Sequence, residues 1–158
     1  MLDFNHNYFM EQALREAKKA YDLNEVPVGA VVVFENRIIG KGHNQVEQLK
    51  DPTAHAEMIA ISAAAAYLEE KRLVGCSLYV TLEPCPMCAG AIIHSRLENL
   101  VFGAFDSKWG CCSTLYNLPQ DSRFNAQIPI ISGIKEMESE QLLKSFFNKL
   151  RTKNANLN

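Results

Sequence analysis

Two short segments about thirty residues apart carry one imidazole, two thiols and a spare carboxylate. The first is His55-Ala56-Glu57, and the second is Pro84-Cys85-Pro86-Met87-Cys88. A catalytic zinc ion takes three protein ligands and leaves its fourth tetrahedral position to water. If His55, Cys85 and Cys88 bind one ion, the fold must bring residue 55 next to residues 85–88. Few chain arrangements satisfy that condition.

A closed structural zinc site would need a fourth protein ligand, usually from a second C-x-x-C. The other cysteines are Cys76 and the adjacent pair Cys111-Cys112, and none of them has that spacing. Cys111 and Cys112 are predicted to be small packing residues. We therefore expect an open zinc site with His55, Cys85 and Cys88 as its ligands.

The local pattern places these ligands at the starts of helices. Cys85 follows the strand-like run 77–82 and precedes an apolar segment that is typical of a helix, so Cys85 and Cys88 share a first helical turn. The helix dipole favours thiolates there. His55 opens another helix, with a capping side chain expected from residues 51–53. Glu57 lies on a different face from His55, so it is predicted to be the general acid and base and not a ligand.

The rest of the chain alternates helices and strands. Helices are predicted over 8–23, 55–68, 85–95 and from 138, and strands over 28–34, 38–40, 78–82, 100–102 and 127–131. Pro129 would confine the last strand to a sheet edge. We expect one α/β domain over residues 1–158, with the apolar stripe of the last helix facing the core.

Composition sets the cellular context. The odd count of five cysteines and the absence of a signal-peptide pattern at the N-terminus favour a cytoplasmic protein. No uncharged stretch is long enough to span a bilayer, so no membrane partner is expected. The net charge is −2, so any affinity for nucleic acid must come from a local patch.

His-x-Glu followed by Pro-Cys-x-x-Cys is the pattern of zinc-dependent nucleobase deaminases. Five segments of this chain closely resemble the bacterial tRNA-specific adenosine deaminases. These segments are residues 25–31, 51–57, 81–85, 92–96 and 101–104. The resemblance extends from the first helix to Phe146-Phe147. It implies a three-layer α/β/α cytidine-deaminase-like fold with a central five-stranded mixed sheet, one Zn²⁺ per subunit and a homodimer.

The resemblance also implies substrate contacts. In this family an asparagine matching Asn44 holds the flipped nucleoside, and Ala56 beside His55 is a further expected contact. Residues matching Asp106 and Lys108 contact the anticodon loop, and one matching Asn125 lies at the mouth of the pocket.

Further RNA contacts are expected near the C-terminus, where residues 141–153 form a basic helix end without any Asp or Glu. The candidates there are Phe147, Lys149, Arg151 and Lys153. The chain departs from its relatives at Ala126-Gln127, where histidine and arginine are common. It also departs at Trp109, which stands in place of a small or polar residue and is expected either to stack on a splayed base or to cover the core.

The predicted function is hydrolytic deamination of adenosine to inosine at the wobble position of tRNA, with the anticodon stem-loop as the bound element. One alternative is a deaminase of a free nucleobase or nucleotide of the guanine or cytosine type, which needs no basic tail. A remote alternative is thiol-disulfide exchange by Cys85 and Cys88, which leaves His55 and Glu57 unexplained.

Overall fold

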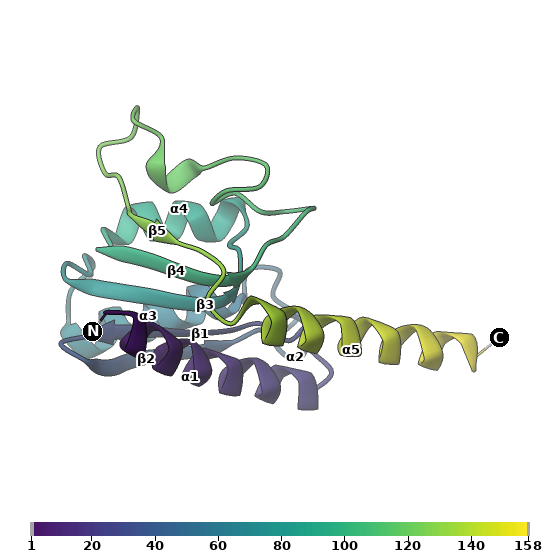
Figure 1. Cartoon of the computed structure of the whole chain (residues 1–158). Helices are drawn as coiled ribbons and strands as arrows, with labels where there is room; N and C mark the ends of the chain where they lie inside the picture. The colour runs from purple at the N-terminus through teal and green to yellow at the C-terminus, as the bar shows by residue number, and fades with distance from the viewer. Residues whose placement is uncertain (1, 158) are drawn as a thin grey trace.

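The computed structural model describes the backbone of residues 2–157 and the side chains of residues 6–157. Its centre is a five-stranded sheet with the strand order β2-β1-β3-β4-β5 (Figure 1). The strands are β1 (Gly29–Phe34), β2 (Arg37–His43), β3 (Cys76–Leu82), β4 (Asn99–Ala104) and β5 (Ile130–Ile131). β1 is antiparallel to β2 and β3, whereas β3, β4 and β5 are parallel. The predicted mixed sheet of five strands is therefore confirmed.

Helices cover both faces of this sheet. α1 (Leu2–Asp22) and α5 (Glu136–Ala155) lie on one face, and α3 (Ala56–Leu68) and α4 (Pro86–Ser95) lie on the other (Figure 1). Alternate side chains of β1 point to opposite faces, so Val32 packs with the α3 and α4 layer while Val31 packs with α1. A strand that is buried on both faces needs a continuous apolar run, and the sequence of β1 has one. The three-layer α/β/α fold is confirmed.

Most predicted elements are present, with shifted ends. α1 begins at Leu2, six residues before the predicted start, and β2 is longer than the predicted 38–40. Two short helices were not predicted, α2 (Val46–Leu49) and the 3-10 helix η1 (Leu118–Gln120). β5 lies at the edge of the sheet directly after Pro129, as the missing N–H of proline requires.

Small residues let α3 lie unusually close to β2. A Cβ atom at Gly42 would overlap the carbonyl oxygen of Ala56, and one at Gly40 would overlap that of Ala60. The facing side of α3 consists of Ala56, Ala60 and Ala64, all fully buried. This close contact fixes where α3 begins, and therefore also the position of His55, which immediately precedes the helix.

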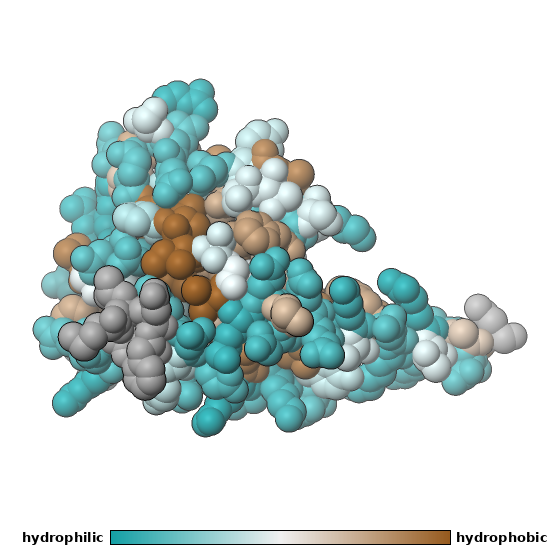
Figure 2. Space-filling view, in the orientation of Figure 1, coloured by the Kyte–Doolittle hydropathy of each residue, from teal (hydrophilic) through white to brown (hydrophobic). Residues whose placement is uncertain are grey.

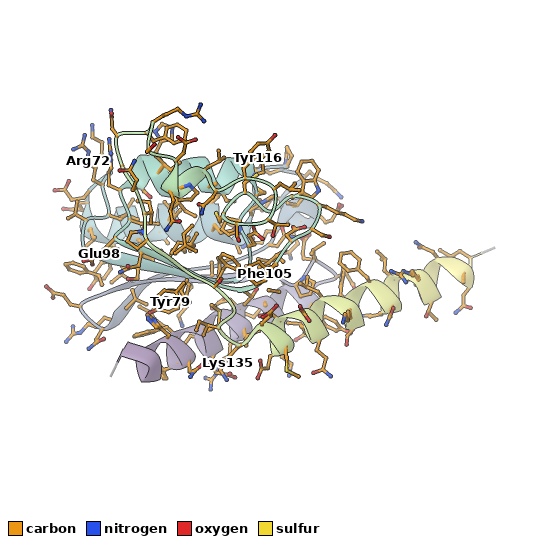
Figure 3. The ribbon with its side chains drawn as sticks, turned by 45° about the horizontal axis from the view of Figure 1, so that its top comes forward. Arg72, Tyr79, Glu98, Phe105, Tyr116 and Lys135 are labelled. Atoms are coloured by element: carbon orange, nitrogen blue, oxygen red, sulfur yellow. The ribbon has the colours of Figure 1, made fainter. Side chains whose placement is uncertain are left out.

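The second half of α5 extends past the sheet as an arm and runs beside the end of α1 (Figure 1). Its surface is mainly hydrophilic, in contrast to the hydrophobic side chains that gather beside the sheet on the same view (Figure 2). On the α1 face, Tyr79 of β3 points toward α1 (Figure 3), and its hydroxyl lies 2.8 Å from Nδ1 of His6. Among residues 2–157, no helix has the length and apolar character needed to cross a membrane.

Candidate active site

His55, Cys85 and Cys88 meet at one point, and their candidate ligand atoms all lie within 4.8 Å of one another. Nδ1 of His55 is 3.6 Å from the sulfur of Cys85 and 3.6 Å from that of Cys88. A tetrahedral zinc ion with bonds of about 2.3 Å to sulfur and 2.0–2.1 Å to nitrogen would hold those ligands about 3.5–3.6 Å apart. The donor set and its spacing therefore fit zinc, with Nδ1 as the histidine ligand.

Two helix starts hold the ligands in place. His55 is the N-cap of α3 and Cys85 is the N-cap of α4, both in extended backbone conformation, and Pro86 occupies the first turn of α4. The prediction that residues 51–53 cap the helix of His55 is wrong: His55 itself is the N-cap, and no side chain accepts a capping hydrogen bond from the first turn of either helix. The carboxylate of Asp51 instead accepts hydrogen bonds from the backbone N–H and hydroxyl of Thr53, which closes the turn that leads into the helix.

The charges at the site suit a metal ion and a proton carrier. A hydrogen bond from the Cys88 thiol, with a smaller contribution from His55, lowers the pKa of Cys85 to about 4. The ionised thiolate is the form that binds zinc. Glu57 is 4% exposed, and burial raises its pKa to about 7. A carboxyl group in that range can both accept and donate a proton near neutral pH.

A cavity of about 780 Å³ opens directly over this cluster. Besides the ligands His55 and Cys85, its lining contains six of the predicted site residues, which are Asn44, Ala56, Glu57, Asp106, Trp109 and Phe147. The side chain of Asn44 donates to the carbonyl oxygen of Val26 at 3.2 Å and accepts from the N–H of Val46 at 3.2 Å. Asn44 is thus held at the wall of the cavity by the segment that precedes β1.

The loop after β4, residues 105–114, forms another wall of the cavity and begins at Phe105 (Figure 3). The buried carboxylate of Glu83 accepts hydrogen bonds from the N–H groups of Asp106, Cys112 and Thr114 and from the hydroxyl of Thr114. A Cβ atom at Gly110 would overlap this carboxylate, so only glycine fits there. All four hydrogen bonds come from the loop, so Glu83 holds the loop against the end of β3.

The structure identifies cavity residues that the sequence patterns missed. Glu25 is 1% exposed and lines the cavity, where its carboxylate accepts hydrogen bonds from the N–H groups of Glu47 and Gln48. No local pattern distinguishes Glu25 from a surface carboxylate. The prediction that the whole apolar stripe of the last helix faces the core is wrong in part. Phe146 is buried, but Phe147 and Leu150 are about 40% exposed and line the cavity.

Other predicted contacts lie away from the cavity lining. Asn125 lines a second, shallower hollow together with Lys71 and Arg72. Lys108 is exposed on the loop after β4, next to the cavity residue Trp109. On α5, Lys149 lies 3.4 Å from the side-chain oxygen of Asn24 and 5.0 Å from the ring centre of Tyr21.

Arg151 and Lys153 are fully exposed on the last turns of α5. No ion pair of the described residues involves either side chain, so both cations face solvent.

Cys111 and Cys112 are buried and all five cysteines are free, as expected for packing residues. Cys88 is fully buried as well. Two thiolates that bind one metal ion together with His55 are not free to attack a disulfide, so the ligand geometry disfavours that alternative.

Comparison with known proteins agrees with this geometry. Residues 4–104 match the model of the cytidine and deoxycytidylate deaminase zinc-binding region. The tRNA-specific adenosine deaminase of Bacillus subtilis (strain 168) is 52% identical over 145 residues, which cover 92% of this chain and 90% of the relative.

Solved structures show the same relationship. A structure from a study of A-to-I editing by tRNA:A34 deaminases at the wobble position of transfer RNA superimposes with a TM-score of 0.83. It is 42% identical and covers 86% of this chain and 99% of its own. The guanine deaminase of Nitrosomonas europaea superimposes with a TM-score of 0.76 at 26% identity, and the match covers 89% of this chain and 83% of that enzyme's chain. The chain therefore belongs to the zinc-binding cytidine and deoxycytidylate deaminase family, in its branch of tRNA-specific adenosine deaminases.

Proposed function

We propose that this protein deaminates adenosine to inosine at the wobble position of tRNA, with the anticodon stem-loop as the element that it binds. The observation that carries the proposal is the His55, Cys85 and Cys88 cluster, with Glu57 beside it, in a chain that shares half its residues with a tRNA-specific adenosine deaminase. The reaction adds water across the N1–C6 bond of adenine, with the oxygen on C6, and releases the C6 amine as ammonia.

His55, Cys85 and Cys88 would hold the metal ion. Zinc bound there supplies Lewis acidity and lowers the pKa of a coordinated water toward about 7. Glu57 lies in the cavity floor, two residues from His55. Its carboxylate takes a proton from the attacking water and passes it to N1 of the adenine ring. It then takes the remaining proton of the hydroxyl group now on C6 and delivers it to the amine at C6, which leaves as ammonia.

The cavity walls would select the nucleotide. Asn44 and Ala56 lie on the wall next to His55, where a flipped nucleoside must sit to place C6 over the metal site. Asp106 approaches from the loop after β4 and Phe147 from α5. The exposed cations at the end of α5 would contact phosphates beyond the cavity, which a chain of net charge −2 can do only through a local patch.

We also propose a homodimer that pairs through the outer side of α3 and α4. α3 is apolar on all sides, yet Ala63, Ala66 and Tyr67 on its outer side are exposed. A helix with apolar residues all round is normally buried. Gly90 in α4 points to open space, where a Cβ atom would meet no other atom of this chain. Both features are explained by a second copy that packs there.

The decisive experiment is an inosine assay on an anticodon stem-loop with adenosine at the wobble position. Parallel reactions contain the same RNA with guanosine there, and free adenosine, guanine and cytosine. We expect inosine from the first RNA alone. Turnover of free guanine without RNA turnover would instead favour the guanine deaminase function, which the similarity to the Nitrosomonas europaea enzyme makes the second candidate.

The dimer is tested by light scattering on the zinc-loaded protein. We expect twice the 17.7 kDa mass of one chain. Ala66→Arg on the outer side of α3 should give monomers. Ser145→Arg, at an exposed position of α5, should leave the dimer intact. A monomeric parent protein would refute the pairing and leave the deaminase function standing.

A further inference from the structure

Trp109 is the only tryptophan of the chain, and 63% of its surface is exposed. A buried tryptophan removes about 150–250 Å² from water and is among the strongest single contributions to a core. Trp109 does not make that contribution, so the expectation that it covers the core is wrong. Its side chain instead lines the cavity that contains His55 and Glu57. Large exposed apolar side chains beside a binding site mark a surface that a ligand covers.

The backbone of Trp109 is fixed relative to the metal site. Its N–H donates to the carboxylate of Asp106 at 3.1 Å, and the N–H of Asp106 donates to Glu83 at 3.1 Å. Glu83 is 2% exposed and stands two residues before the ligand Cys85. Three consecutive links therefore connect the backbone of Trp109 to the zinc ligand and fix where the side chain enters the cavity wall.

A second apolar wall approaches the same cavity from α5. Phe147 is 40% exposed and Leu150 is 43% exposed, and both line the cavity with Trp109. The cavity measures about 780 Å³, which is more than one nucleoside occupies. Space with apolar walls thus remains once the target nucleotide is seated over His55.

We propose that Trp109 is a stacking platform for one unstacked base directly next to the target nucleotide in single-stranded RNA. This inference rests on the proposed function. A target base can enter the cavity only when it leaves the base stack, and its neighbour then loses a stacking partner. An exposed indole replaces that partner, and it does so for any base, since every base has a π-face. Trp109 thus selects for the presence of a neighbouring base and not for its identity.

The single tryptophan gives a direct measurement, because all tryptophan emission of the protein comes from Trp109. Zinc-loaded protein is titrated with the product stem-loop, which carries inosine at the wobble position. Two further RNAs carry an abasic site immediately before or immediately after the inosine. Binding is measured independently by anisotropy of the labelled RNA.

We expect the intact RNA to quench the emission. One abasic RNA should lose the quenching and bind on the order of ten-fold more weakly, while the other should behave like the intact RNA. RNA that binds without quenching, or equal quenching by both abasic RNAs, overturns the proposal.

Variants separate stacking from a structural role. Kinetics use the same RNAs with adenosine in place of inosine. Trp109→Ala should raise the KM for the intact stem-loop on the order of ten-fold with kcat nearly unchanged, and should have no effect on the sensitive abasic RNA. Trp109→Phe should restore the preference for the intact RNA. Tyr116→Ala is the matched control, since Tyr116 is 67% exposed and does not line the cavity (Figure 3).

An equal loss on intact and abasic RNA with Trp109→Ala would show a merely structural residue and overturn the proposal. The inosine assay distinguishes this failure from failure of the function itself. If the parent protein makes inosine but shows no quenching, the function stands and only the stacking role falls.

Discussion

The buried carboxylate of Glu83 accepts the backbone N–H of Asp106 at 3.1 Å, and this bond joins the strand that precedes a zinc ligand to the loop on the opposite wall of the cavity. The same carboxylate also binds the backbone of Cys112 and Thr114. One side chain therefore sets the distance between the metal site and the residues that face the nucleotide. An acidic residue is needed because all the groups pointing at it are donors.

Glu83→Gln should loosen the loop without removing the metal. The amide NH₂ would face N–H donors, and leaving buried donors unsatisfied costs about 1–3 kcal/mol each. We expect a melting temperature lower by about 2–4 °C per kcal/mol, faster proteolysis within residues 105–114 and unchanged zinc content. Glu98→Gln, at an exposed position, is the control. A variant that loses zinc would show that Glu83 acts on Cys85 and not on the loop.

Cys88→Ala should lose zinc and deaminase activity together. The two remaining ligands, His55 and Cys85, are fewer than the three that a catalytic zinc site requires. Zinc is measured by mass spectrometry of metals and activity by inosine formation. Cys112→Ala, which removes a buried thiol outside the cluster, should keep both. Full zinc occupancy in Cys88→Ala would contradict the assigned ligand set.

Glu57→Gln should keep zinc and lose most of the activity. The amide side chain would fill the same buried space but could not carry protons, and general acid-base assistance contributes about 10²–10⁴-fold to a rate. We expect kcat to fall by at least about 10²-fold, with zinc content and affinity for the product RNA nearly unchanged. Activity within a few-fold of the parent, or loss of the metal, would refute the role.

The basic end of α5 should be visible in the salt dependence of RNA binding. Lys149 already lies beside Asn24 and Tyr21, so Arg151 and Lys153 are the free cations to test. Replacing both with glutamine should lower the log-log salt slope by about 1.4–1.8, at 0.7–0.9 per phosphate contact.

Turnover by the same double variant at saturating RNA should be nearly normal, because the zinc cluster is untouched. Replacing Arg15 and Lys18 on α1 removes equal charge and should leave the salt slope unchanged. An unchanged slope in the α5 variant as well would mean that this helix end contacts no phosphate.

Gly42→Ala should destabilise the fold through α3. The added methyl group would overlap the backbone of Ala56, and overpacking of this kind costs about 1–3 kcal/mol. Because Ala56 follows the ligand His55, zinc affinity should fall along with the melting temperature. Ser145→Ala, at an exposed position of α5, should change neither. A stable variant with normal zinc affinity would show that α3 can move away from β2 at no cost to the site.

The sequence by itself determined the chemistry and the order of the elements. The prediction of His55, Cys85 and Cys88 as ligands, and of Glu57 as the acid and base, follows from residue types within a few positions of two helix starts. Helix starts depend on local backbone signals, such as Pro86 in the first turn of α4. The apolar run of β1 likewise indicated a strand buried on both faces. Alternate residues of a strand point to opposite faces, so burial of both faces requires apolar side chains at consecutive positions.

Only the tertiary structure decided which surfaces meet. Glu83, Glu25 and Trp109 have ordinary local surroundings in the sequence, and their roles depend on segments 20 or more residues away. The apolar stripe of α5 looks uniform, yet Phe146 is buried while Phe147 and Leu150 stay exposed beside the cavity, because the second half of the helix extends past the sheet. Periodicity reports which face of a helix is apolar, but whether protein or ligand covers that face is fixed by where the helix lies.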